Sequence, residues 1–273
     1  MLQISDLFIY PVKSLGGISV EKAEISSMGL LHDRRWMLVD RSNRFLTQRE
    51  IPAMCLLQVD LLDDGLRVHH RHHPEKWIQV AYVPEGQTLQ EVKLFEDYCQ
   101  ALPVSKRADR WFTEMLGVTC QLMYIPEDSV RKVDPDYAPV GTRTGFADAF
   151  PFLLIGRSSM DDLNHRLTEK MSILRFRPNI VFEGGDPFLE DRMDHLQINE
   201  VNFFAVKPCA RCTVPTINPE NASRTDEPIK TLSDYRKKNH KVYFGQNMIS
   251  EGNGRIHVGN PLKIVKYKNP IAF

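Results

Sequence analysis

Two of the five cysteines, Cys209 and Cys212, lie three positions apart in the stretch VKPCARCTVP. A pair with this spacing is typical of a metal site, a redox dithiol or a disulfide. A structural zinc site needs four ligands, commonly from two Cys/His pairs, and the chain has no second CxxC. A thioredoxin-like dithiol lies between a strand and a helix, whereas Pro215 and Pro219 prevent an immediate long helix here. Both interpretations are therefore disfavoured.

The remaining interpretation of the pair is one reactive thiolate with a structural neighbour. Lys207 and Arg211 lie beside the two cysteines, and nearby cations favour the thiolate form of a cysteine. A thiolate ligates soft metals or attacks electrophiles. A single protein thiolate leaves the other positions of a metal to a non-protein ligand, which indicates a metal cofactor with its own donors.

A possible anion-binding segment lies near the start of the chain, in YPVKSLGG. Lys13 and Ser14 directly follow an expected strand and precede Gly16 and Gly17. An ammonium, a hydroxyl and approachable backbone N–H groups are the parts of a phosphate cradle. The GxxxxGK spacing of a Walker loop is absent, and a simple turn after a strand explains the same residues.

Arginines gather in two further segments, HDRRW and RFRPNIVF. The first contributes Arg34 and Arg35, and the second contributes Arg175 and Arg177 at alternate positions, which share one face of an extended chain. A guanidinium suits phosphate oxygens and the polar edge of a pterin. Taken singly, each arginine is better explained by a surface ion pair.

Acidic residues give a weaker signal. The chain has no serine nucleophile elbow, no GxGxxG and no pair of carboxylates that can be assigned to catalysis. Asp33 and Asp148 are the acids nearest to the candidate segments.

Composition excludes several classes of protein. The 273 residues allow one large domain or two small ones, and 42% hydrophobic with 26% charged residues is typical of a globular protein. Basic and acidic residues balance at 35 each, so no overall charge attracts nucleic acid or an anionic membrane. Neither a signal-peptide core nor a bilayer-spanning apolar run is present, so we expect a cytoplasmic location. Three further cysteines are expected to be buried thiols: Cys55, Cys99 and Cys120.

Short apolar or alternating runs bounded by turn residues predict that most of the chain forms strands. Two hairpins are predicted, one turning at Asp64–Gly65 and one near Asn199–Glu200. The other predicted strands lie at 4–12, 34–40, 77–83, 120–125, 150–156, 179–184 and 261–267.

Helices are fewer. One is predicted over 105–117, ending at Gly117, and another over 158–170, capped by serines; 231–239 is a weaker candidate. Many strands with few interleaved helices predict a mainly β fold with helical additions. A long polar loop at 131–148 roughly separates two halves, and long loops in compact domains are often functional.

These segments, in this order, resemble the MOSC superfamily with its N-terminal barrel extension, as found in bacterial MOSC reductases and mitochondrial amidoxime-reducing components. The resemblance covers about residues 2–267. It implies an N-terminal MOSC β domain at 1–97 and a MOSC domain at 98–273, with a β-barrel core at about 123–267. The segments that carry it are LFIYPVKSLGG, GLLHDRRWMLVD, FLTQRE, FADAFPFLLI, FRPNIVF, VKPCARCTVPTINPE and YFGQNMI with GRIHVGNPLKI.

The resemblance also implies a molybdenum cofactor, Mo-molybdopterin, bound between the two domains. In this family the second cysteine of the motif ligates the metal, which here is Cys212. Asp148 falls where the family lines the cofactor cleft, although Ala147 and Ala149 stand where relatives often carry hydroxyl side chains. The implied cofactor contacts are Lys13, Ser14, Arg34, Arg177, Arg211 and Asp148.

The implied activity is reduction of small N-hydroxylated compounds, namely hydroxylamines, amidoximes and N-hydroxylated bases, to the amine. Cys212 would anchor the metal and Asp148 is a candidate general acid. No cysteine follows Cys212, so a separate electron-transfer protein of the ferredoxin, flavodoxin or flavin reductase type is expected. The alternatives are a molybdenum-cofactor or sulfur carrier that uses a cysteine persulfide, and a cofactor-free β-barrel interaction module.

Overall fold

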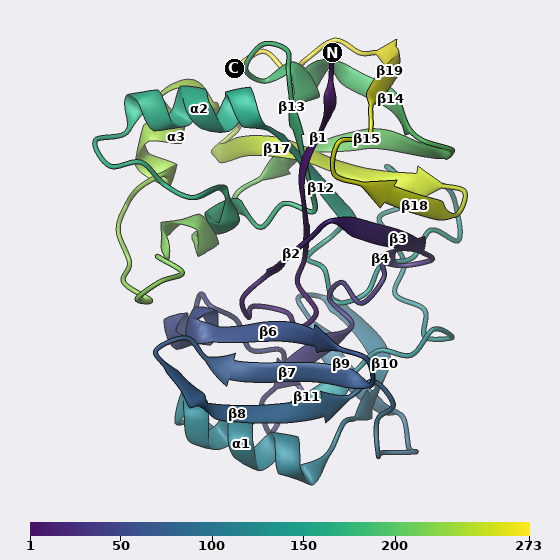
Figure 1. Cartoon of the computed structure of the whole chain (residues 1–273), viewed down its shortest axis with the longest axis vertical. Coiled ribbons are helices and arrows are strands. Elements are labelled where there is room, and N and C mark those ends of the chain that lie inside the picture. The colour runs from purple at the N-terminus through teal and green to yellow at the C-terminus, as the bar shows by residue number, and fades with distance from the viewer.

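The computed structural model describes all 273 residues and shows two lobes, one above the other (Figure 1). Most regular structure is β, which confirms the predicted mainly β fold with helical additions. None of the α-helices is long and apolar enough to cross a bilayer.

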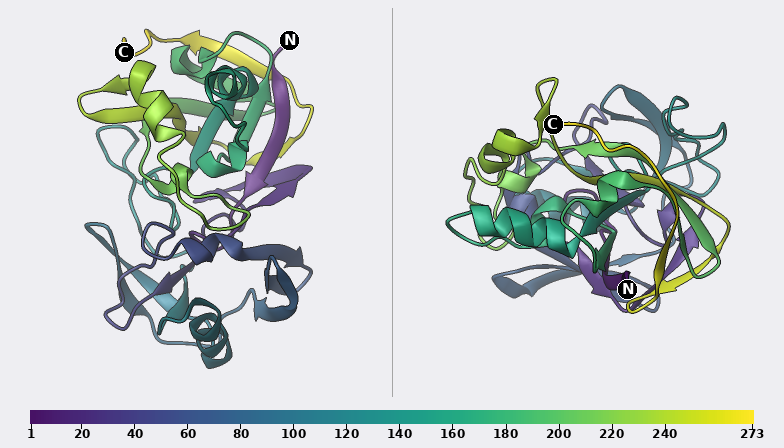
Figure 2. Two further views of the ribbon diagram at one scale, coloured as in Figure 1. Left: turned by 90° about the vertical axis from the view of Figure 1, so that its left-hand side faces the viewer. Right: turned by 90° about the horizontal axis from the view of Figure 1, so that it is seen from above.

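The upper lobe is built on a nine-stranded sheet in the order β19-β14-β15-β17-β12-β13-β1-β2, with β16 added beside β17. The sheet curves strongly when seen from above (Figure 2, right). The strands are β1 (Gln3–Ile9), β2 (Ile18–Val20), β12 (Phe152–Gly156), β13 (Ile180–Glu183), β14 (Met193–Ile198), β15 (Val201–Ala210), β16 (Lys237–Lys238), β17 (Lys241–Glu251) and β19 (Leu262–Tyr267).

A second, three-stranded sheet completes the core of the upper lobe. It has the order β18-β3-β4, from β18 (Gly254–His257), β3 (Lys22–Ser26) and β4 (Gly29–Leu30). Side chains from both sheets form one cluster of 19 buried apolar residues. Burial of this apolar surface stabilises the curved sheet.

The lower lobe contains two further sheets and α1 (Lys106–Leu116). The four-stranded sheet has the order β5-β11-β10-β9, from β5 (Trp36–Val39), β11 (Gln121–Tyr124), β10 (Asp97–Pro103) and β9 (Gln90–Leu94). The three-stranded sheet joins β6 (Leu57–Leu62), β7 (Gly65–His70) and β8 (His73–Ala81). A cluster of 17 buried residues lies beneath α1 and these strands.

The first predicted helix is confirmed together with its caps. The Ser105 hydroxyl accepts the Ala108 N–H at 3.1 Å, and Gly117 ends α1 with φ 68°. α2 (Arg157–Arg166) and α3 (Ile229–Tyr235) also form, but the predicted serine cap of α2 is wrong. Ser159 instead donates to buried Glu190 at 2.8 Å, a partner distant in sequence. Four 3₁₀ turns complete the structure: η1 (Pro52–Leu56), η2 (Ile173–Phe176), η3 (Leu189–Arg192) and η4 (Val214–Thr216).

Both predicted hairpins form. The β14–β15 hairpin turns at Asn199–Glu200, as predicted, and Asn199 has φ 51°. The β6–β7 register pairs Leu62 with Gly65, so the turn lies at residues 63 and 64, one residue before the predicted position.

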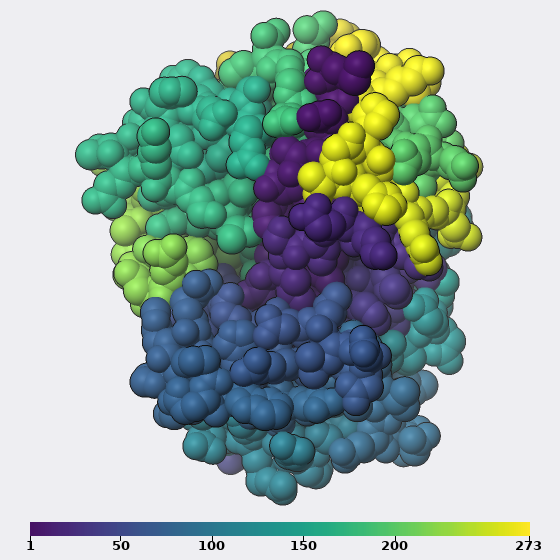
Figure 3. Space-filling view, viewed as in Figure 1, coloured from purple at the N-terminus to yellow at the C-terminus, as the bar shows by residue number.

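The strand pairing does not divide the chain at the expected boundary between residues 97 and 98. β10 begins at Asp97 and pairs with β9 and β11, so the chain stays in the lower lobe until about Tyr124. At the other end, β1 pairs with β13 and β3 pairs with β18, which places the first strands in the upper lobe. The N-terminal segment (purple) therefore lies against the C-terminal one (yellow) in Figure 3. The chain passes between the lobes after β4 and again after β11, and the segment 10–17 between β1 and β2 also reaches the lower lobe, where Leu15 is buried. All three segments contribute residues to the site.

Candidate functional site

A cleft of about 310 Å³ brings together the residues that the resemblance implied as metal and cofactor contacts. It is lined from both lobes and from the segments that pass between them. The predicted residues that line it are Lys13, Ser14, Arg34, Asp148, Arg177, Arg211 and Cys212.

The cleft is strongly basic although the chain as a whole has zero net charge. Asp148 is the only acid in the lining, against seven basic side chains. Low-dielectric walls with one sign of charge concentrate ions of the opposite sign. The arrangement therefore favours an anionic ligand. The basic residues are Lys13, Arg34, Arg49, Arg177, Lys207, Arg211 and Lys241.

Tyr10 organises two of the arginines. Its ring is buried between the guanidinium groups of Arg34 and Arg177, whose central carbons lie 4.3 and 4.2 Å from the ring centroid. Arg34 also forms a two-pronged ion pair with buried Asp33, at 2.8 and 2.6 Å. Stacking and bidentate pairing both fix a guanidinium in one orientation. The two charges thus remain adjacent despite their mutual repulsion.

Arg177 has spare hydrogen-bonding capacity. Its Nη1 donates to the Leu15 carbonyl at 2.6 Å, but its Nη2 is buried and has no partner. Burial, with the neighbouring charge of Arg34, lowers the pKa of Arg177 to about 10, so the group is charged at neutral pH. A buried charged donor without a partner is costly, and an anion at this point would satisfy it.

Three of the predicted residues have left-handed backbone conformations. Their φ angles are 67° at Ser14, 47° at Arg34 and 56° at Arg177. Non-glycine residues in this region are uncommon, and strain of this kind gathers at binding sites. The Ser14 carbonyl is held by Gln48 at 2.6 Å, so its conformation is fixed by the fold.

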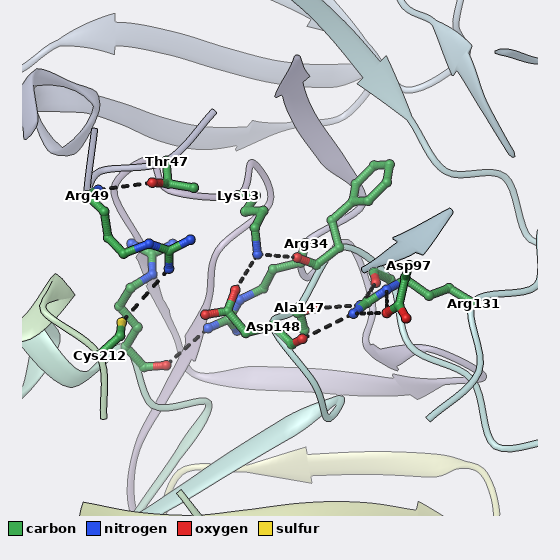
Figure 4. A network of polar contacts seen from close by, with 12 residues as sticks. Lys13, Arg34, Thr47, Arg49, Asp97, Arg131, Ala147, Asp148 and Cys212 are labelled. Atoms are coloured by element: carbon green, nitrogen blue, oxygen red, sulfur yellow. Dashed lines mark hydrogen bonds and ion pairs between the residues drawn. The ribbon is translucent and has the colours of Figure 1, made fainter. Parts of the chain in front are cut away.

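The two cysteines have different environments. Cys209 is partly buried and accepts from Arg211 Nη1 at 3.0 Å, whereas Cys212 is exposed. Arg211 also donates to the Phe176 carbonyl at 2.8 Å, while its Nε is buried without a partner. Arg49 reaches from the lower lobe to within 4.0 Å of the Cys212 Sγ (Figure 4). Cys212 is therefore the sulfur available to a ligand.

Lys13 and Asp148 form an ion pair within the cleft (Figure 4). The Lys13 Nζ also donates to the Phe146 carbonyl at 2.8 Å. Burial lowers the pKa of Lys13 to about 8, partly offset by the charge of Asp148. Burial alone would raise the pKa of Asp148, but the Lys13 charge and hydrogen bond hold it well below its ordinary value. The Asp148 side chain remains 60% exposed, so it still presents an oxygen to the cleft.

Buried Arg131 holds the loop that carries Asp148 (Figure 4). Its guanidinium donates to the carbonyls of Gly145, Ala147 and Asp148 at 2.9, 2.5 and 3.1 Å. The same group pairs with Asp97 of β10 at 2.9 Å. The loop position is thus set by β10, an interior strand of the lower-lobe sheet.

Some parts of the sequence-based expectation are corrected. Arg175 does not share a face with Arg177, because the segment forms η2 and Arg175 donates to the Pro215 carbonyl outside the cleft. The Gly16 N–H donates to the Leu57 carbonyl at 2.9 Å and is not free to cradle a phosphate. A Cβ on Gly17 would lie 2.3 Å from the Tyr10 ring, so packing against Tyr10 requires this glycine.

Sequence reasoning missed several residues that line the cleft. The segment FLTQRE was singled out as a whole, but its Thr47, Gln48 and Arg49 were not assigned to the site. The only hint in the sequence was the positive charge of Arg49 within that segment. Its approach to Cys212 depends on the fold.

The donor set also limits how a metal could be held. No three side chains of His, Cys, Asp or Glu gather where they could hold a metal ion. A metal in the cleft would therefore take one sulfur from Cys212 and its other ligands from a cofactor. The unpartnered donors of Arg177 and Arg211 fit the anionic parts of such a group.

Comparison with family models identifies the class of protein. The model described as "MOSC N-terminal beta barrel domain" matches residues 1–119, and the one described as "MOSC domain" matches residues 141–263. Together they cover most of the chain, which belongs to the MOSC superfamily.

Two groups of relatives are similar over nearly all of this chain. "Mitochondrial amidoxime-reducing component 1" of Homo sapiens is 29% identical over 96% of this chain and 82% of its own length. "Molybdenum cofactor sulfurase" of Solanum lycopersicum is 30% identical over 92% of this chain, which spans only 33% of that protein. The solved structure of YiiM from Geobacillus stearothermophilus matches 43% of this chain at 15% identity and a TM-score of 0.33, too weak a likeness for an argument.

Proposed function

We propose that the cleft binds Mo-molybdopterin and that the protein uses it to reduce N-hydroxylated compounds to amines. One observation carries the proposal: unpartnered buried donors of Arg177 and Arg211 share a basic cleft with the exposed sulfur of Cys212. Guanidinium groups suit a phosphate and a pterin, and a thiolate suits a metal already bound by sulfur. The name of the molybdenum cofactor sulfurase relative supports the same cofactor, and that of the amidoxime-reducing relative supports the reduction.

Within this proposal, each part of the cleft has a separate task. Cys212 ligates the metal, and the stacked pair Arg34 and Arg177 faces the anionic part of the cofactor. Further contacts come from Lys13, Ser14, Arg211 and the Asp148 side of the cleft. Cys209 holds Arg211 through its sulfur and is a packed neighbour of the site.

The bound cofactor would supply two electrons, which with two protons convert an N–OH group into N–H and water. The chain must bring a proton to the departing oxygen. Asp148 is ionised at neutral pH, whereas Lys13 holds a proton beside it. We therefore assign Asp148 to orienting the N–OH group and Lys13 to holding the proton, which refines the expectation of Asp148 as the general acid.

The proposed substrates are small hydroxylamines, amidoximes and N-hydroxylated bases. The proposal includes a separate electron-transfer protein of the ferredoxin, flavodoxin or flavin reductase type and a cytoplasmic location. Amidoxime reduction appears in the name of the human relative, and this chain matches 82% of that relative's length.

A second function is favoured by the similarity to plant molybdenum cofactor sulfurases, 30% identical over most of this chain. In that case the protein would carry cofactor or sulfur, and exposed Cys212 would hold a persulfide. The chain spans a third of those proteins, so their whole activity is not expected here.

One experiment separates the two functions. The cofactor-loaded protein is given reduced methyl viologen and an N-hydroxylated base, and amine formation is measured; cyanide-releasable sulfur is measured in parallel. If the protein is a reductase, wild type forms amine. The Asp148→Asn variant should form it at least about tenfold more slowly, because the N–OH group loses an orienting carboxylate. Loaded protein that forms no amine but releases sulfur from Cys212 would contradict reduction and support the carrier.

A further inference from the structure

A tight basic turn projects from the upper lobe between β16 and β17 (Figure 2, left). Asn239 and His240 form the turn with φ of 47° and 62°, which matches a two-residue type I′ hairpin. The register places Lys238 opposite Lys241 and Lys237 opposite Val242. All three lysines are exposed, so the turn presents them to solvent in a fixed arrangement.

The charges on this turn are not explained by stability. Like charges directly opposite each other on paired strands are destabilising. No carboxylate lies within 4.0 Å of Lys237, Lys238 or Lys241, although lysines and arginines elsewhere in the chain form 12 ion pairs. With zero net charge over the whole chain, this concentration is local. A partner that carries negative charge would relieve the repulsion.

The turn is directly connected to the site. The Arg211 N–H donates to the Val242 carbonyl at 2.7 Å, so the strand that leaves the turn is hydrogen-bonded to the residue beside Cys212. Lys241 lines the same cleft as Cys212. A protein bound at the turn would therefore lie next to the mouth of the cleft.

Another lysine without an acidic partner lines the cleft. Lys207 also lines the cleft and has no carboxylate partner, and its Nζ lies 3.8 Å from the centroid of the Tyr137 ring. Tyr137 is 38% exposed and packs edge-on against Phe150 of the cleft wall. We define the basic docking surface as Lys207, Lys237, Lys238 and Lys241 with Tyr137.

We propose that the basic docking surface binds an acidic electron-transfer protein that reduces the site in the cleft. The inference rests on the proposed function and names the place where its electron donor binds. Each N–OH group reduced takes two electrons and two protons and releases one water, so a one-electron donor is oxidised twice. Complementary charge steers encounter, and electron-transfer complexes use small, transient interfaces. Three exposed lysines and a fourth that lies over an aromatic ring fit such an interface.

The test compares two electron sources in one double variant, Lys237→Glu with Lys238→Glu, neither of which lines the cleft. Reduced acidic two-iron ferredoxin is the protein donor, and reduced methyl viologen is the donor that needs no docking. The matched control is Lys22→Glu with Lys76→Glu, two exposed lysines on β3 and β8. Stability is measured in both, and a carboxylate opposite Lys241 is expected to raise the melting temperature slightly.

The expected result is a KM for ferredoxin raised about tenfold, with a weaker salt dependence and an unchanged viologen-driven rate. The control should leave all three unchanged. An unchanged ferredoxin KM in the double variant, with normal viologen turnover, overturns the docking surface and leaves the proposed function standing. Single-stranded nucleic acid is the other possible occupant of a basic turn. If the turn binds it while ferredoxin kinetics do not change, the docking surface is likewise overturned and the proposed function stands. If cofactor-loaded wild type forms no amine with reduced methyl viologen, the proposed function is wrong. If ferredoxin also fails to bind it at low salt, the docking surface is wrong as well.

Discussion

Single residues in the cleft are held in positions that cost stability. Arg177 and Arg211 each bury an unpartnered nitrogen, and Ser14, Arg34 and Arg177 have left-handed backbones. Unsatisfied donors and strained residues each cost about 1–3 kcal/mol. Such costs persist where a ligand repays them, which is the residue-level argument for an anionic cofactor.

The buried ammonium of Lys13 gives a prediction on pH. Its pKa is about 8 in the folded protein against 10.5 for an ordinary lysine, so between these values the unfolded chain binds more protons. The free energy of unfolding should therefore rise with pH in this window, relative to Lys13→Met. We expect the free energy of unfolding of wild type minus that of Lys13→Met to rise by about 2 kcal/mol from pH 7 to pH 10, measured by urea unfolding.

The control for this prediction is Lys76→Met, because Lys76 is exposed on β8. Its difference from wild type should be the same at both pH values. A difference for Lys13→Met that does not change with pH would show that burial does not perturb this ammonium.

The sequence pointed to residues that line one cleft, but their pairings could not be predicted. Lys13, Arg34, Arg177 and Cys212 do line one cleft. The ion pair of Lys13 with Asp148 and the approach of Arg49 to Cys212 join residues more than 130 positions apart. Only the packing of the two lobes decides such contacts, and no local pattern records them.

At the scale of elements, prediction succeeded where the deciding contacts are local. α1 has its serine cap and glycine stop within its own segment, and Asn199 turns its own hairpin. The cap of α2 failed because Ser159 binds Glu190, which lies on η3. The pairings of β1 with β13 and of β9 with β10 cross the expected boundary between residues 97 and 98.

The Arg131 side chain links the loop at 145–148 to β10, because it donates to three carbonyls of the loop and pairs with Asp97. Replacing Arg131 with methionine would leave buried carbonyls without a donor, at a cost of about 2–4 kcal/mol in the free energy of unfolding. The measurement is urea unfolding at pH 7. Arg143→Met is the matched control, since Arg143 donates to the exposed Glu127 carbonyl from the same loop and should cost about 0.5 kcal/mol. Equal losses in the two variants would contradict the assigned role of Arg131.

At the scale of the whole molecule, the site exists only when both lobes are folded together. Lys13 and Arg34 come from two separate segments that pass between the lobes and Arg49 from the lower lobe, whereas Arg177, Arg211 and Cys212 come from the upper lobe. A ligand that binds only this assembled cleft also stabilises the fold by mass action. Retention of the proposed cofactor and stability of the two-lobed structure would therefore be coupled.

The molybdenum content of freshly purified protein tests the central claim most directly. The account predicts close to one molybdenum per chain in wild type and in Cys209→Ala, and loss of most of the metal together with amine formation in Cys212→Ala. Wild-type protein without molybdenum after expression in a host that makes the cofactor, or Cys212→Ala with full metal and turnover, would contradict it.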